Sequence, residues 1–255
     1  MPTSILPVDS SQPLLPGIIG MSVHTDCVYL QEINRAGHSS SSEPSISNMK
    51  LILQGMDFEQ LISDIQRGHR GAAQEAVQQA LSAVQRAGAD FLVVTANTVG
   101  AMLEEMSEAV GVPVLDITKA VLGEAVNQGI SRLGLLSTSQ TAESGIYQAR
   151  ALEFDCIVST PPTQIAQAID EVIFQRLVKG ILREQDAQTI IEAVSWFKDQ
   201  GIEAVILGCT DMTLLMPQLK AAELPLLDST IIHAQAAYYV ATTGDLESFC
   251  VRYPA

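Results

Sequence analysis

The residues best suited to chemistry are Gly208-Cys209-Thr210-Asp211, where a thiol, a hydroxyl and a carboxylate follow one another. The run before them, 204–207, is wholly apolar and ends in a turn signal, which is typical of a buried strand in a parallel sheet. Ligands of open α/β sheets bind at the carboxyl ends of the strands. We therefore expect Cys209 on a loop facing a ligand crevice, although an isolated cysteine is more often a buried packing residue.

The same pattern occurs earlier in the chain. Residues 88–98 align with 201–211 without a gap, and each copy has a glycine, an acidic residue, an apolar strand and a closing polar pair. Residues 112–118 likewise match 224–230, and 17–22 match 134–139 more loosely. These matches indicate an internal duplication. Ala96 holds in the first copy the position that Cys209 holds in the second.

Strand-like and helix-like segments alternate through both copies, which predicts an α/β fold of two pseudo-symmetric, doubly wound parallel-sheet domains. The active site is expected in the cleft between them, flanked by residues 96 and 209. We predict a flexible lead-in over 1–15, an N-terminal domain over 16–117 plus 229–243, a C-terminal domain over 118–228 and a tail over 244–255. Expected strands are 17–20, 51–53, 91–95, 112–115, 133–136, 154–158, 204–207 and 226–227. Expected helices are 26–35, 72–86, one running through 106, 118–127, 165–178, 187–199 and 230–242, with a mobile Ser-rich loop over 37–47.

Composition narrows the class of protein. A net charge of -15 argues against nucleic acid or an anionic membrane as a partner, because both require basic surface. No apolar run approaches 18 residues, and residues 1–15 lack the basic start of a signal peptide. The four cysteines are far apart and show no zinc-binding spacing, so we expect no metal and a reducing, cytoplasmic setting.

Two thiols facing each other across a cleft could invert a stereocentre. One would remove a proton from a carbon, and the other would return a proton to the opposite face. A thiol suits this task because its ordinary pKa of about 8.5 lies near working pH. The hydroxyls of 137–141 precede a helix, so they could bind a carboxylate together with free backbone N–H groups, or serve only as helix caps.

The Gly-Cys-Thr-Asp motif, the Asn97-Thr98 pair and the Gly-Met-Ser segment near the start resemble the cofactor-independent aspartate/glutamate racemase superfamily over residues 16 to about 243. The Cys-Thr-Asp form is similar to that of the aspartate racemase branch, and the segment 16–22 resembles the start of the cyanobacterial aspartate racemases of microcystin biosynthesis. The resemblance implies two catalytic cysteines, no pyridoxal phosphate or other cofactor, no metal, aspartate as substrate and a homodimer.

Carried onto this chain, the resemblance places the acid/base pair at Cys209 and position 96, and the substrate amino group near Asp211. The implied substrate-binding residues are Met21, Ser22, Gln54, Asn97, Thr98, Thr138, Ser139, Thr141, Thr210 and Asp211. The chain departs from the family at position 96, where the methyl group of alanine cannot transfer a proton. We therefore expect a chain that binds aspartate but scarcely racemises it. A single glycine, Gly20, ends the first strand, and no basic residue is evident near Gln54 or in 165–174.

Two other functions stay open. One is a one-cysteine relative, such as an arylmalonate-type decarboxylase, in which a single thiol protonates a planar intermediate. The other is a non-enzymatic protein that binds small dicarboxylates. Asp211 favours an amino acid over an aryl malonate. His233, on the predicted last helix, is interpreted as an interior polar residue rather than a base.

Overall fold

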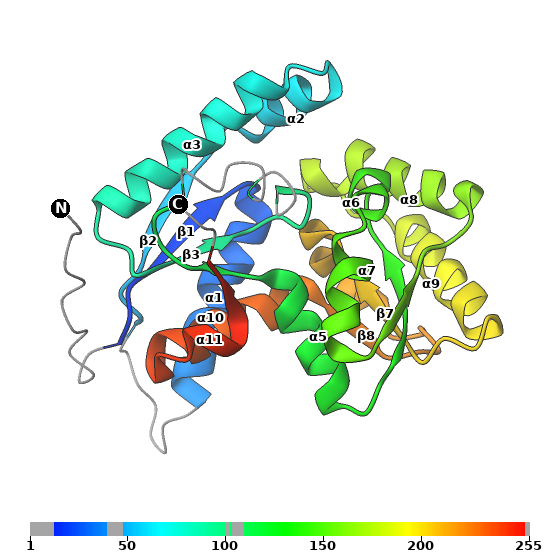
Figure 1. The fold of residues 1–255 in the computed structure, drawn as a ribbon. Coiled ribbons are helices and arrows are strands. Elements are labelled where there is room, and N and C mark those ends of the chain that lie inside the picture. The colour runs from blue at the N-terminus through cyan, green and yellow to red at the C-terminus, as the bar shows by residue number, and fades with distance from the viewer. Residues whose placement is uncertain (1–12, 40–47, 100–102, 104–109, 253–255) are drawn as a thin grey trace.

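Two parallel β-sheets, one from each half of the chain, form the framework of the fold (Figure 1). The computed structural model describes residues 13–39, 48–99, 103 and 110–252. The first sheet has the strand order β2-β1-β3-β4-β9 and the second β6-β5-β7-β8. The strands are β1 (Pro16–Gly20), β2 (Ile52–Gly55), β3 (Phe91–Val94), β4 (Val114–Leu115), β5 (Arg132–Leu136), β6 (Ile157–Ser159), β7 (Ala204–Leu207), β8 (Leu226–Asp228) and β9 (Cys250–Val251).

The two sheets share one topology. β1 lies between β2 and β3 just as β5 lies between β6 and β7, and all these pairs are parallel. β4 then follows β3 as β8 follows β7. The duplication predicted from the sequence is therefore a duplication of architecture, and the predicted α/β class with two parallel-sheet domains is confirmed.

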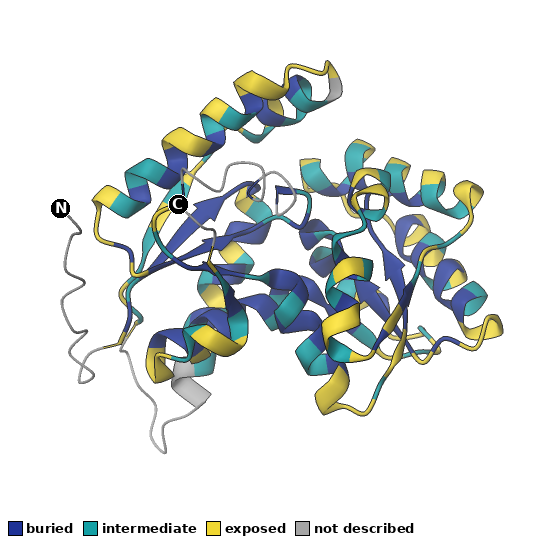
Figure 2. Ribbon diagram, in the orientation of Figure 1, coloured by how far each residue is buried: buried dark blue, intermediate teal, exposed yellow. Residues whose placement is uncertain are grey.

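Helices cover both faces of each sheet. They are α1 (Val23–Ser39), α2 (Phe58–Gln66), α3 (Arg70–Arg86), α5 (Ile117–Asn127), α6 (Ser139–Ser144), α7 (Ile146–Ala151), α8 (Thr163–Gln175), α9 (Glu184–Asp199), α10 (Ser229–Thr243) and α11 (Leu246–Phe249), with 3-10 helices η2 (Leu152–Phe154), η3 (Leu177–Lys179) and η4 (Thr210–Gln218). Alternate residues of a strand point to opposite faces. In the first sheet Leu92 and Val94 pack with α3, whereas Phe91 and Val93 pack with α1 and α10. The central strands β1, β3, β5 and β7 are consequently the most buried part of each domain (Figure 2).

The second domain is built in the same way. Val205 and Leu207 of β7 pack with α8 and α9, and Ala204 and Ile206 pack with α5 and α7. Gly134 of β5 faces Phe197 of α9 so closely that an added Cβ would lie 2.7 Å from the ring. The sheet and α9 can approach this closely only because residue 134 has no side chain.

The chain crosses between the domains through α5 and α10, and both helices begin with the same device. Asp116 accepts hydrogen bonds from the backbone N–H groups of Thr118 and Lys119, and Asp228 accepts them from Thr230 and Ile231. A carboxylate at this position satisfies otherwise unpaired donors at a helix start. Helix α10 then returns to the first domain, where its alanines and Val240 join the core under β1 and β3.

Several predicted elements differ from the structure. The segment predicted as a tail, 244–255, contains α11 and β9, and β9 pairs antiparallel with β4. The start of the predicted Ser-rich loop is wrong, since α1 extends to Ser39, and residues 40–47 lie outside the described part. Most of the helix predicted through 106 lies outside it too. Helices α2 and η4 were not predicted. No helix in the described ranges is long and apolar enough to cross a membrane.

The close approach at Gly134 can be tested by substitution. We expect Gly134→Ala to lower the free energy of unfolding by about 1–3 kcal/mol, because the new methyl group overpacks the buried ring of Phe197. Gly55→Ala in β2 is the control, since a Cβ there would meet nothing within 4 Å. Urea unfolding of both variants is the measurement, and equal midpoints would contradict the packing described.

Candidate active site

Ala96 and Cys209 line one pocket at the boundary between the domains. Each lies two residues beyond a central strand, since β3 ends at Val94 and β7 at Leu207. In each sheet the loops after the parallel strands lie at the carboxyl edge. The loops after β3 and β7 belong to different sheets, and both line this pocket. The pocket also takes in other residues that the sequence predicted for the site, namely Asn97, Thr98, Thr138, Thr210 and Asp211.

A relay of threonine hydroxyls leads into this pocket from the second domain. Thr138 donates to the Oγ1 of Thr141 over 3.0 Å, and Thr141 lies 2.9 Å from the Oγ1 of Thr98. Because Thr141 accepts a hydrogen bond from Thr138, its own O–H group can donate to Thr98. Thr98 then retains an O–H group that can donate to a ligand in the pocket, such as a carboxylate oxygen.

Asp211 is the acidic group of the pocket. Its Oδ1 accepts a hydrogen bond of 2.9 Å from the hydroxyl of Ser22, which lies at the end of β1 in the other domain. Burial raises the pKa of Asp211, while the hydrogen bond from Ser22 and the nearby His24 oppose that rise. A cation at this carboxylate would relieve the cost of burying it, and an ammonium group is a suitable one.

The other polar residues next to the two loops serve to hold the loops. Asn97 accepts from the hydroxyl of Tyr147 at 2.7 Å and donates to Ser229 at 3.2 Å. Thr210 donates its hydroxyl proton to the carbonyl oxygen of Thr95 at 3.1 Å. These side chains are buried, and their hydrogen bonds run between the two halves, so they fix the spacing of the loops.

Three predicted site residues lie elsewhere. Gln54 lines a separate surface hollow beside α2 and α3, and its amide donates to the carbonyl of Gly55. Met21 is buried below the loops, with its N–H bound to the hydroxyl of Thr95. The backbone N–H and the hydroxyl of Ser139 both bind Asp170 of α8 rather than facing the pocket. None of these three residues lines the pocket that holds Ala96 and Cys209.

Cys209 is held as a neutral thiol. Burial is the largest cause that raises the pKa of its sulfur, and the carboxylates of Asp211 and Asp170 add to it. Backbone N–H groups of Asp211 and Met212 oppose the rise. The sequence analysis did not identify Asp170, because no motif marks a single acidic residue within the predicted helix 165–178.

The remaining wall of the pocket is apolar and was also missed. It consists of Phe58, Leu61, Ile62 and Ile65 of α2, facing Ile173, Phe174 and Val178 of α8 and η3. The spacing of the four α2 residues is that of one helix face, so the pattern was present in the sequence. It was overlooked because no helix was predicted over residues 58–66.

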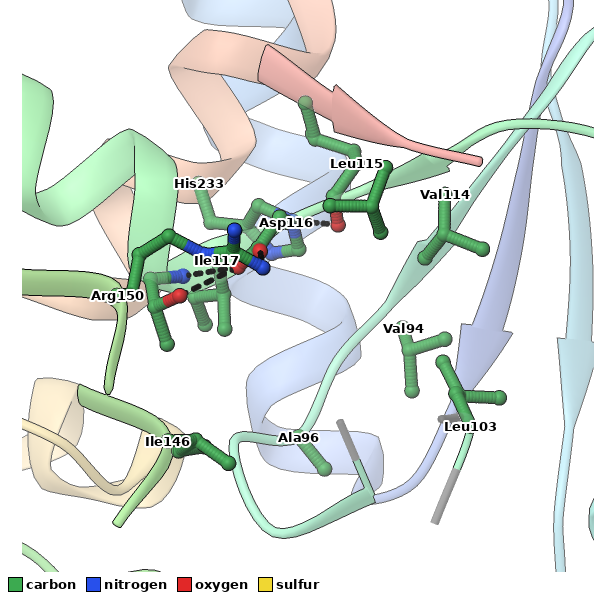
Figure 3. A pocket seen from close by; sticks show the side chains of 12 residues that line it. Val94, Ala96, Leu103, Val114, Leu115, Asp116, Ile117, Ile146, Arg150 and His233 are labelled. Atoms are coloured by element: carbon green, nitrogen blue, oxygen red, sulfur yellow. Dashed lines mark hydrogen bonds and ion pairs between the residues drawn. The ribbon is translucent and has the colours of Figure 1, made fainter. Parts of the chain in front are cut away.

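A second hollow lies behind Ala96, which lines both (Figure 3). Its polar end holds the ion pair between Arg150 and Asp116, with 2.7 Å between Nη2 and Oδ2. His233 borders the same hollow, 1% exposed, as the sequence analysis expected of an interior residue. Its Nε2 donates to the carbonyl of Leu115 and its Nδ1 accepts from the hydroxyl of Tyr29. Burial lowers the pKa of His233 to about 4.

Within the described ranges no three His, Cys, Asp or Glu side chains are grouped so as to hold a metal ion. Among the described residues, the site comprises one thiol, one acidic residue, a hydroxyl relay and an apolar wall. Such a set is suited to moving a proton at a carbon atom of a small amine-bearing ligand.

Comparison with known proteins assigns the chain to a family. The model of the Asp/Glu/Hydantoin racemase family matches residues 18–237, so the chain belongs to that family. A crystal structure of a Yersinia pestis protein, provisionally described as an Asp/Glu racemase, superposes with a TM-score of 0.77 at 30% identity, covering 89% of this chain and 99% of that one. An aspartate racemase homologue from Pyrococcus horikoshii shares the fold, with a TM-score of 0.70 at 23% identity over 89% of this chain and 98% of that one.

Among curated proteins, the broad specificity amino-acid racemase RacX of Bacillus subtilis is 25% identical over 60% of this chain and 65% of its own length. Glutamate racemases also match, among them that of Corynebacterium kroppenstedtii, 30% identical over 50% of this chain and 44% of its own length. The chain thus spans less than two thirds of the curated relatives it matches. The comparisons establish the family and leave the substrate among amino acids open.

The buried imidazole generates a prediction about stability. The unfolded chain takes up a proton at His233 near pH 6.5, whereas the folded chain resists it until about pH 4. Stability from this group is therefore present above pH 6.5 and lost as the pH falls toward 4, by about 3 kcal/mol in total. The His233→Gln variant should lose less stability over this range than the parent. Chemical unfolding at pH 7, 5.5 and 4 checks this, and parallel curves for the two proteins would refute the neutral imidazole.

Proposed function

We propose that this chain binds an α-amino acid between its domains and that Cys209 exchanges the α-proton on one face without inverting the centre. The observation that carries the proposal is the pairing of Cys209 with Ala96 in one pocket of a racemase-family fold. A racemase without a cofactor needs a proton carrier on each face of the carbon. The methyl group of Ala96 cannot serve as one, so only the face toward Cys209 is active.

The roles of the other groups follow from their chemistry. The carboxylate of Asp211 would bind the ammonium group, and the hydroxyl of Thr98 would donate to the α-carboxylate. The thiol of Cys209 would then face the α-carbon. Binding of the ammonium group would also neutralise one of the charges that raise the pKa of Cys209, so the substrate itself favours the thiolate that removes the proton.

Aspartate is the substrate proposed from the sequence. Its support is the Cys-Thr-Asp motif, which resembles that of aspartate racemases, and the fold shared with an aspartate racemase homologue. The narrower placement in the microcystin pathway stays a prediction from the sequence.

One observation favours a second candidate, the one-thiol decarboxylase. The raised pKa keeps Cys209 protonated, which is the state that a proton donor to a planar intermediate requires. Loss of carbon dioxide from phenylmalonate, dependent on Cys209, would identify this function in place of the first.

Exchange in D₂O tests the proton transfer. With an amino acid that binds, one enantiomer should lose its α-hydrogen signal in NMR without inversion, and its rate should rise with pH as more thiolate forms. Ala96→Cys should raise interconversion of the enantiomers by about 10²-fold or more, since it supplies the missing acid/base group. The matched control is Ala96→Ser, of similar size but without an acidic proton of comparable pKa.

The double variant Ala96→Cys/Cys209→Ala should lose interconversion again, as chiral chromatography would show. Racemisation by the unaltered chain at ordinary enzymatic rates would exclude the one-thiol assignment. A folded, amino-acid-binding Ala96→Cys variant without activity would exclude the racemase geometry.

We also propose a homodimer in a cytoplasmic setting, with the dimer suggested by the family resemblance. Light scattering at micromolar concentration should give twice the chain mass of 27.3 kDa. A mass of 27.3 kDa would show a monomer instead.

A further inference from the structure

The side chain of the bound amino acid must lie against the part of the pocket that the ammonium and carboxylate groups do not use. Asp211 and Thr98 are at the loops that follow the strands, so the free wall is the apolar one. It is formed by α2 on one side and by α8 with η3 on the other. Phe58, Leu61 and Ile65 of α2 also pack against the core of the first domain, and the half-buried Ile62 lines the pocket beside them.

No lysine or arginine lines this pocket. All fourteen lysines and arginines of the chain fall within the described ranges. Three of them lie within two residues of the apolar wall in the sequence, and none lines the pocket. Arg67 is exposed at the C-cap of α2. Arg176 pairs with Asp186 at 2.5 Å and with Glu171, and Lys179 is exposed, with its Nζ 3.4 Å from Gln175. A second carboxylate on the substrate would therefore find no cationic side chain along the wall.

The charges that are present have the opposite effect. Asp211 and Asp170 both lie close enough to Cys209 to raise its pKa. An anionic side chain held beside the thiol would be repelled by both carboxylates in a poorly solvated site. His24 lies near Asp211 and packs against Gly180, where an added Cβ would lie 2.5 Å from its Nε2. It is not among the residues that line the pocket.

On the basis of the proposed function, we infer that the natural substrate is an α-amino acid with an uncharged, apolar side chain. Its zwitterionic end would match one acidic residue and one hydroxyl donor, and its side chain would fill the space between Ile62 and Phe174. This assigns specificity to α2 and α8 rather than to the cysteine loops. The inferred substrate thus differs from the aspartate that the family resemblance implies, and its side chain would have the size of that of leucine or phenylalanine.

Calorimetry on the unaltered chain is the first measurement, with leucine, phenylalanine, aspartate and glutamate as ligands. We expect at least about tenfold tighter binding of leucine or phenylalanine than of either dicarboxylate. Tighter binding of aspartate or glutamate would overturn the inference.

A reversal of charge on the wall gives the second measurement. Ile62→Lys places an ammonium group where the substrate side chain is expected and should shift the ratio of affinities toward aspartate or glutamate by about tenfold or more. Ile157→Lys is the control, because Ile157 is 64% exposed on β6, and it should leave the ratio unchanged. If Ile62→Lys does not fold, Val178→Lys on η3 makes the same test. An unchanged ratio in a folded pocket variant would overturn the inference.

The α-proton exchange in D₂O separates this inference from the function on which it rests. Cys209-dependent exchange with apolar amino acids supports both. Exchange with aspartate or glutamate alone keeps the proposed function and rejects the apolar substrate. Absence of binding and exchange with every amino acid rejects both.

Discussion

The site depends on hydrogen bonds that join the two halves of the chain around the loops after β3 and β7. Thr210 reaches the carbonyl of Thr95, Ser22 reaches Asp211, and Thr98 meets Thr141, each across the boundary between the halves. These bonds are at least partly buried, so breaking one would leave a polar group without a partner. They hold residues 96 and 209 in one pocket, and the same loops bring Thr98 and Asp211 into it.

Burial at the same boundary determines the protonation of the reacting groups. The thiol of Cys209 lies near the carboxylates of Asp211 and Asp170. Asp26, which accepts a hydrogen bond from Thr95, lies close to Asp211. Desolvation disfavours the charged form of each acid, so the pKa values of Cys209, Asp211 and Asp26 are all raised. A cation bound at Asp211 would favour the charged form of that carboxylate and so oppose the effect of burial. The glycine at position 20 belongs to the same arrangement, because a Cβ there would lie 2.3 Å from Asp26.

The sequence predicted those features that local pattern and duplication control. Apolar runs marked the strands, and the repeat around Ala96 and Cys209 predicted that two loops would meet. The repeat 112–118 with 224–230 also has a physical meaning that the pattern alone did not reveal, since Asp116 and Asp228 cap the two helices that cross between domains. Features fixed only by tertiary packing escaped prediction. β9 forms because Cys250 and Val251 reach the open edge of β4. The apolar face of α2 borders the pocket as well as the core of the first domain.

Differences between the two copies of the duplicated unit make the site asymmetric. Two equal halves would place like groups on both sides of a substrate, which suits an inversion. In this chain the aligned positions differ in each chemical respect, with alanine against cysteine at 96 and 209 and threonine against aspartate at 98 and 211. In the proposed function, one half would supply the hydroxyl for the carboxylate, and the other would supply the acid for the ammonium group and the thiol for the proton. The fold keeps the symmetry of its strands, because they pack the cores, while the loops that follow them differ in the groups that they bring to the pocket.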